Sequence, residues 1–181
     1  MADITLSSNS YIKPYRAAKG SALVRHIMGS TFAANSSIVI GDVVVSDTNS
    51  GSTAPYMMIR MIGTGTAPST AIYGIAAGNV THDGSTGVTG AAGPTTAKTP
   101  VWIAERDSEF VSVTKTAGTN STSIGRLASL KRDSTLGIWY ADLANSTAGD
   151  AIVRITGVLN PGDTNGLVTW RFISTACFFT D

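Results

Sequence analysis

The chain has 181 residues, which suffices for one domain with a sizeable apolar core. Charged residues make up only 14% of it and hydrophobic residues 43%, whereas charged residues are usually about 25% of a soluble domain, so extended solvated helices with charge ladders are disfavoured. The formal net charge of +1 gives no global reason to expect a nucleic-acid or membrane partner.

The first 20 residues are predicted to form an extended N-terminal arm, because they lack a sustained apolar period. Residues 1–30 carry four basic residues and one acidic residue, a net +3, so this end is basic and the remainder mildly acidic. Tyr11-Ile-Lys-Pro-Tyr-Arg16 combines aromatic rings, cations and a proline, a composition suited to lying on another surface. The alternative is that this segment folds back as an edge strand, with Ile4, Leu6 and Ile12 covering the chain's own body.

Short β-branched and apolar runs follow the arm, separated by Gly-, Ser- and Thr-rich turns, a pattern typical of strands. Gly41-Asp42 interrupts the second run and is expected to form a tight corner. After the fourth run, residues 79–100 contain almost no bulky apolar side chain and are interpreted as a long exposed loop. The predicted strands of this half are 22–28, 37–45, 55–62 and 71–77.

The second half repeats the pattern and ends in its clearest stretch, 123–179. Val168, Trp170 and Phe172 fall on one side of a strand while Thr169 and Arg171 fall on the other, because strand side chains alternate. The turn-rich loop 160–166 predicts a hairpin, and Gly157 suggests a bulge. The predicted strands are 101–104, 109–113, 123–130, 136–142, 151–159, 167–173 and 176–179, with a charged turn at 105–108.

The sequence therefore predicts an all-β protein: an antiparallel β-sandwich or β-barrel over residues 21–181 as a single domain, preceded by the arm. Met1 to Leu6 lacks a secretory signal pattern, and no apolar stretch approaches the roughly 20 residues that span a bilayer. We expect the chain to be made in a cytosol-like compartment and to have no membrane partner. Cys177 is the only cysteine, so no intrachain disulfide can form.

Catalytic and metal motifs are weak. His26 and His82 have no partner at metal-ligand spacing, and a hydrolytic site using His82 or the acidic cluster Glu105 to Glu109 competes with the simpler interpretation of solvated loops. Gly63-Thr-Gly65 is not followed by a helical pattern that could bind phosphate. We expect no cofactor, no metal and no enzymatic activity. Trp102, Trp139 and Trp170 could stack on sugars, and Cys177 could be reactive, but core packing is the preferred role of all four.

Two short segments carry a resemblance to a known family. Val39-Ile-Gly-Asp-Val-Val-Val45 and Ile72-Tyr-Gly-Ile-Ala76 are similar to a corner and a later strand of β-tulip-like capsid stabilisers. The β-rich body and the surface rich in Ser, Thr, Gly and Ala likewise resemble the head decoration, or cement, proteins of tailed bacteriophages.

This resemblance implies a β-tulip or jelly-roll-like structural protein on the outside of the virion. Its partner would be the major capsid protein, whose neighbouring subunits it would bridge, and it would form a homo-oligomer, with a trimer favoured. The candidate contact residues lie in the arm: Tyr11, Lys13, Pro14, Tyr15, Arg16 and Lys19. The alternatives are a virion-associated carbohydrate-binding or adhesion module and, as a third class, a β-fold hydrolase.

Overall fold

The fold is all-β, as the sequence predicts. The structure is a computed structural model, and strands β1 to β14 with one 3₁₀ turn, η2 (Ser121–Ser123), account for its regular elements in the described part of the chain. The described residues are 4–7, 10–16, 24–29, 37–46, 58–61, 65–66, 72–81, 98–115, 119–144 and 150–177. The long loop predicted at 79–100 lies mostly outside them.

The larger sheet contains seven strands, most of them from the C-terminal half. Its order is β1-β10-β14-β13-β11-β12, with the short β6 pairing alongside β11, and every ladder is antiparallel. The strands are β1 (Lys13–Arg16), β6 (Gly65–Thr66), β10 (Glu109–Val113), β11 (Leu127–Arg132), β12 (Trp139–Asp142), β13 (Val153–Val158) and β14 (Leu167–Phe172).

The second sheet contains five strands in the order β2-β5-β4-β7-β9, which closes on itself. Four ladders are antiparallel, whereas β2 and β5 meet in a short parallel one that strand patterns do not reveal. A separate pair joins β3 (Ser37–Ile38) to β8 (Val80–Thr81). The five strands are β2 (Val24–Gly29), β4 (Val43–Ser46), β5 (Met58–Met61), β7 (Ile72–Ala76) and β9 (Lys98–Ile103).

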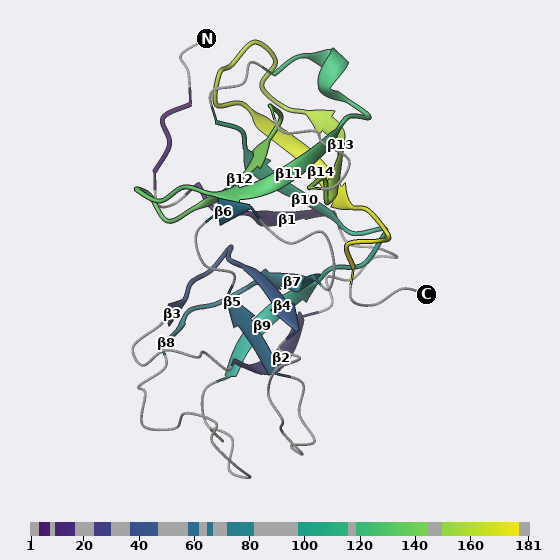
Figure 1. Ribbon diagram of the computed structural model, residues 1–181. Helices are drawn as coiled ribbons and strands as arrows, with labels where there is room; N and C mark the ends of the chain where they lie inside the picture. Colours follow the sequence, from purple (N-terminus) through teal and green to yellow (C-terminus); the bar gives the residue numbers. More distant parts are fainter. Residues whose placement is uncertain are drawn as a thin grey trace.

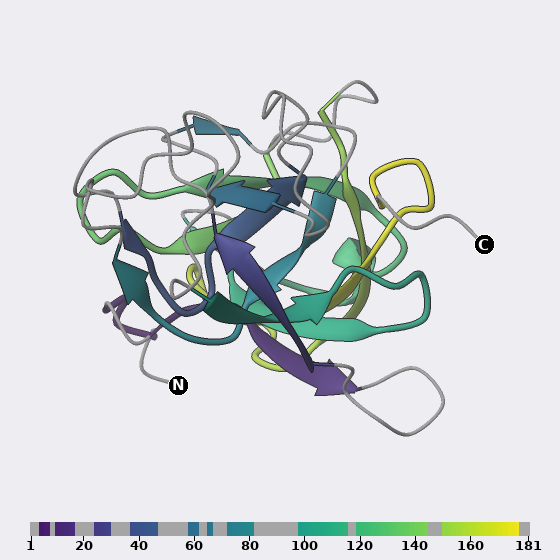
Figure 2. The same ribbon diagram turned by 90° about the horizontal axis from the view of Figure 1, so that it is seen from below.

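The two sheets are stacked one above the other (Figure 1) and share a core of buried side chains. From below, the five-stranded sheet lies in front of the larger one (Figure 2). One cluster of buried side chains joins Val43, Ile72 and Ile75 of the smaller sheet to Trp139 and Trp170 of the larger. Burial of such apolar surface contributes about 25 cal/mol per Å², so the contact between the sheets is a main source of stability.

The β13–β14 hairpin is confirmed, and so is its bulge. The register shifts between Ile155 and Gly157, where a Cβ on the glycine would lie 2.7 Å from Thr169 Oγ1. Val168, Trp170 and Phe172 are all buried, so the predicted core face is also correct.

The charged turn predicted at 105–108 is present. It is a crossover between the sheets, since β9 and β10 belong to different sheets. The strand predicted from Ser123 begins only at Leu127, because the preceding residues form η2 and its exit. The strand predicted at 176–179 lies partly outside the described residues; within them, Cys177 forms an isolated bridge to Ile72.

Candidate partner-binding site

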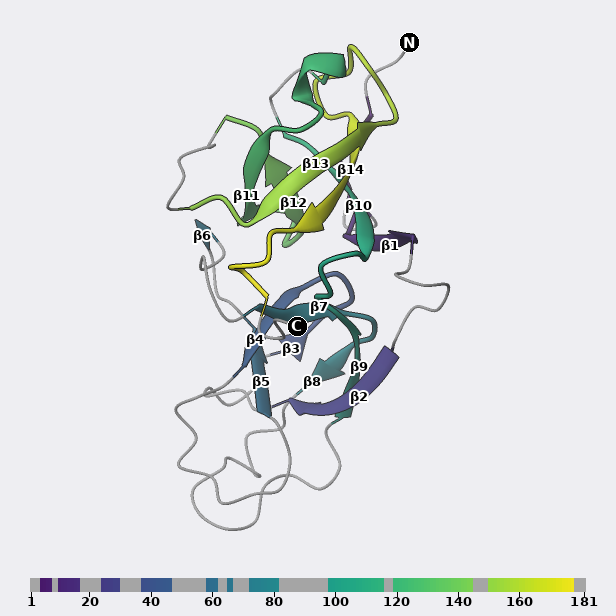
Figure 3. The same cartoon turned by 90° about the vertical axis from the view of Figure 1, so that its right-hand side faces the viewer.

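The described N-terminal residues pack on the chain's own body. Ile12 is fully buried in the shared core, and β1 pairs with β10 as the outermost strand of the larger sheet (Figure 3). Ile4 and Leu6 pack against a smaller apolar cluster that includes Val113 and Tyr140. The structure thus places this segment in the edge-strand arrangement that the sequence left as the alternative to an extended arm.

The loop between β13 and β14 fixes the start of the N-terminal segment by hydrogen bonds to the backbone of Ile4. The Ile4 amide donates to Asp163 Oδ2 at 3.0 Å, and Asn165 Nδ2 donates to the Ile4 carbonyl oxygen at 3.2 Å. The loop is itself ordered by Thr119, whose hydroxyl donates to the Asn160 and Asp163 carbonyl oxygens. Both hydrogen bonds to Ile4 use its backbone atoms, so they hold the segment whichever side chain stands at position 4.

Strand β1 has features that protect an open sheet edge. Pro14 has no amide hydrogen to offer a further strand, and the register with β10 shifts between Pro14 and Arg16, so that Tyr15 is the bulged residue. Exposed cations at Lys13 and Arg16 also discourage edge-to-edge pairing. Addition of a partner strand here is therefore disfavoured, and contacts through side chains are favoured.

The predicted contact residues that the structure describes gather on β1 and just before it. Tyr15 has 49% of its surface exposed, and Lys13 and Arg16 on either side are also exposed. Lys13 Nζ lies 4.7 Å from the centre of the Tyr11 ring, a cation–π contact that orders both side chains. Tyr11 and Pro14 are half-buried, and Lys19 lies outside the described residues.

Two further cations, missed by the sequence analysis, share the face that carries Arg16. Arg154 of β13 and Arg171 of β14 are both exposed and stand directly opposite each other. The alternation of apolar and polar residues already placed Arg171 opposite the core face of its strand. The strand order, which brings β1 and β14 to either side of β10, could not be read from the sequence.

One of the buried carboxylates, Asp42, lies at the predicted Gly41-Asp42 corner. Gly41 has a φ of +88°, and its amide donates to the Ala76 carbonyl, so the corner is tied to β7. Asp42 Oδ1 accepts from Trp139 Nε1 at 3.1 Å and lies 3.5 Å from Arg132 Nε, while Oδ2 accepts from the Val39 amide. Asp42 thus joins the corner of one sheet to β11 and β12 of the other.

The electrostatics of Asp42 are those of a structural group. Burial raises the pKa of this carboxyl, and the Val39 amide, Arg132 and the Trp139 indole oppose that shift. Each of these partners is part of the fold and fixed in place. The arrangement stabilises the contact between the sheets and leaves no oxygen directed at a substrate.

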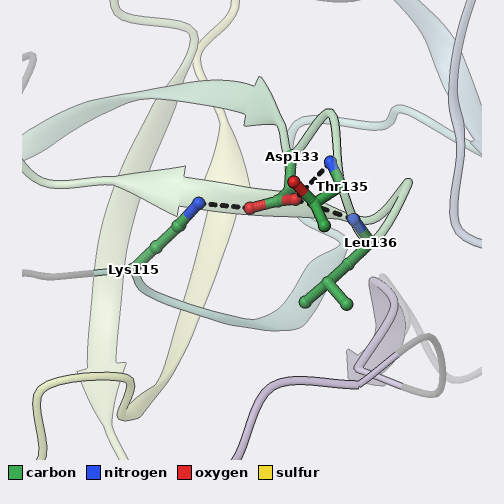
Figure 4. A network of polar contacts seen from close by, with 4 residues as sticks. All are labelled: Lys115, Asp133, Thr135 and Leu136. Carbon is green, nitrogen blue, oxygen red and sulfur yellow. Dashed lines mark hydrogen bonds and ion pairs between the residues drawn. The ribbon is translucent and has the colours of Figure 1, made fainter.

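A second carboxylate orders the turn after β11 (Figure 4). Asp133 Oδ1 accepts from the Thr135 and Leu136 amides at 2.8 Å each, and Oδ2 forms an ion pair with Lys115. The Lys115 ammonium and these amides hold the pKa of Asp133 below its usual value. The site is a structural turn that also supports the apolar cluster around Tyr140.

The remaining sequence candidates behave as core or connecting residues where the structure describes them. Trp139 and Trp170 are 1% and 0% exposed, with Trp170 Nε1 donating to Ser112, so neither ring offers a face to a sugar. Trp102 is partly buried against the same core. Cys177 is buried, and desolvation raises its pKa to about 11, which keeps the thiol protonated. His82 lies outside the described residues.

Searches for familiar chemistry or relatives give no assignment. Within the described ranges, no group of three or more His, Cys, Asp or Glu side chains is placed to hold a metal ion. In the same part of the chain, no helix has the length and apolar character needed to cross a membrane. No protein-family model matches the sequence, and no curated protein matches it significantly.

Proposed function

We propose that this chain is a structural virion protein that binds the outer surface of a phage head and stabilises it by bridging major capsid subunits. The observation that supports this proposal best is the exposed group on β1. A half-exposed tyrosine, Tyr15, lies between Lys13 and Arg16 on a bulged edge strand. Tyrosine and arginine are enriched at protein interfaces, and all three side chains are exposed.

The placement of the large apolar side chains agrees with this proposal. The large apolar and aromatic side chains that the structure describes are mostly consumed in joining the two sheets. The exposed surface is therefore the part of such a protein that binds a partner. Because a shell repeats the same contact many times, modest affinity at each site is sufficient for a stable coat.

The experiment compares co-sedimentation of the wild-type chain with shells assembled from a candidate coat protein, and the temperature at which those shells break open. We expect binding and a higher disruption temperature. The triple variant Lys13→Ala, Tyr15→Ser, Arg16→Ala should lose most of the binding while keeping its unfolding midpoint. Wild-type protein that stays in the supernatant with every candidate shell would refute the proposal.

Side-chain variants are needed because deletion of residues 1–20 does not isolate binding. That deletion would remove Ile12, which is fully buried, and the whole of β1. A matched control is Arg106→Ala with Lys131→Ala, which removes two exposed cations elsewhere. This control should bind shells as the wild type does.

A further inference from the structure

The outer face of the larger sheet carries an ordered row of charges across four neighbouring strands. Phe110, Trp170 and Ile155 point inward and are buried, so the residues beside them in sequence point outward. Arg16 pairs with Glu109, and Arg154 pairs with Arg171. Four residues, Arg16, Glu109, Arg171 and Arg154, therefore form a row across β1, β10, β14 and β13. We call it the basic row.

The position of Glu109 relative to Arg171 follows from the ladder between β10 and β14. Phe110 is opposite Trp170, and Val111 is opposite Thr169. Continuing this antiparallel register by one residue sets Glu109 opposite Arg171. The signs across the sheet are thus plus, minus, plus, plus, with neighbouring positions about 5 Å apart.

The fold compensates only part of this charge, and the Arg154–Arg171 pair keeps its repulsion. Like charges directly opposite each other in a sheet are destabilising, yet Arg154 and Arg171 stand as such a pair. Among the described residues the ion pairs are Lys115 with Asp133 and Arg132 with Asp42, so Glu109 forms a direct ion pair with neither of its arginine neighbours. Arg154 donates to the Gly125 carbonyl at 2.9 Å, a bond that orients its guanidinium without cancelling its charge.

We propose that the basic row docks on an acidic protein surface, in which carboxylates face Arg16, Arg171 and Arg154 and a cation faces Glu109. This inference rests on the proposed function and names the chemistry of the shell surface that the protein meets. Arginine suits the role because its planar guanidinium pairs with a carboxylate through two parallel hydrogen bonds. The repulsion retained in the free protein is relieved when the carboxylates arrive.

Glu109 distinguishes a protein partner from a nucleic acid. A phosphate backbone offers only negative charge, so a glutamate in the middle of the row would repel it. A protein surface can place a lysine or arginine opposite Glu109 and carboxylates beside it. The mixed signs of the row therefore favour a protein.

The first test measures binding of charge variants to shells of a candidate coat protein. Arg154→Gln with Arg171→Gln should weaken binding about tenfold or more, and Arg154→Glu with Arg171→Glu should weaken it further. The matched control, Arg106→Glu with Lys131→Glu, makes the same change in net charge at exposed positions outside the row and should change binding less than twofold. Equal losses in the row and control variants would overturn the proposal.

The second test uses Glu109→Lys with two probes, the same shells and a single-stranded DNA oligonucleotide. Opposite a cation on a protein surface, the new lysine should weaken shell binding about tenfold and create no tight DNA binding. Stronger binding of Glu109→Lys to either probe would overturn the proposal in favour of a phosphate site. Unfolding curves of every variant verify that the fold is intact.

The two proposals fail in different ways. Wild-type protein that binds no shell refutes the proposed function, and the docking surface with it. Wild-type protein that binds shells, with the Arg154 and Arg171 variants binding equally well, refutes the docking surface alone.

Discussion

The two kinds of charged site in this protein, one between the sheets and one on the outer face, are treated in opposite ways by the fold. Between the sheets, Asp42 is held by an indole, a backbone amide and a guanidinium. On the outer face, Arg154 and Arg171 stand opposite each other, and among the described residues no carboxylate forms an ion pair with either. The difference separates charges that stabilise the structure from charges that are available to a partner.

The largest effect is expected from removing the interior carboxylate. Asp42→Ala leaves the Arg132 guanidinium without its counter-ion and the buried Trp139 indole without its hydrogen-bond acceptor. Breaking a buried ion pair costs about 3 kcal/mol or more, so the free energy of unfolding in urea should fall by about that amount. Asp107→Ala, at an exposed position, is the control and should change it by less than about 0.5 kcal/mol. Equal curves for the two variants would contradict a structural role for Asp42.

A second large effect is expected at the corner before Asp42. A Cβ on Gly41 would lie 2.5 Å from Tyr11 Cβ, at a φ of +88° that strains any other residue. Gly162 has a similar φ of +86° but open space around it. Gly162→Ala should cost about 1 kcal/mol of strain, and Gly41→Ala about 2 kcal/mol more from overpacking. Equal losses would show that Tyr11 does not pack on the corner.

The two carboxylates Asp133 and Asp42 should respond to pH with opposite signs. Because the folded-state pKa of Asp133 is lowered, its contribution is present above the unfolded pKa and is lost as pH falls through the folded value. The stability advantage of the wild type over Asp133→Asn, about 1.5 kcal/mol for hydrogen bonds to a charged group, should therefore shrink from pH 7 to pH 3.

For Asp42 the folded-state pKa is raised, so ionisation opposes folding. Relative to Asp42→Asn, the wild type should gain stability as pH falls through the interval between the raised folded pKa and the ordinary pKa. Urea titrations at each pH measure both differences. If the two stability differences changed with pH in the same direction, Asp133 and Asp42 would not differ as the hydrogen-bonded turn carboxylate and the desolvated carboxylate described here.

The smallest effect on stability is a gain. Arg154→Gln removes the repulsion with Arg171 while leaving Glu109 opposite Arg171, so it should stabilise the free protein by about 0.2–1 kcal/mol. Salt should stabilise the wild type more than this variant, because it screens the repulsion only where both arginines are present. A loss of stability in Arg154→Gln at low salt would show that the pair is already compensated.

The sequence predicted local structure well where burial and turn chemistry agreed. The face of β14, the bulge at Gly157 and the Gly41-Asp42 corner follow from alternation and from what glycine permits. The division of strands between sheets did not follow. The turn after β9 looks the same whether it joins two paired strands or crosses between sheets, because the partners of each strand lie far away in sequence.

The candidate site shows the same limit. Lys13, Tyr15 and Arg16 were found because aromatic and basic residues cluster in one short stretch, and the structure places them together on β1. Arg154 and Arg171 were missed because each is a single cation in an otherwise apolar strand. Only the register of four strands from three parts of the chain brings them into one row with Arg16.

The most direct test of the central proposal, that the outer basic face is the working surface, is a cryo-electron microscopy reconstruction of shells decorated with this protein. We predict that the face bearing Arg16, Arg154 and Arg171 lies against the shell, with acidic side chains of the coat protein beside the arginines. A decorated shell in which this face points to solvent, with the five-stranded sheet in contact instead, would contradict it.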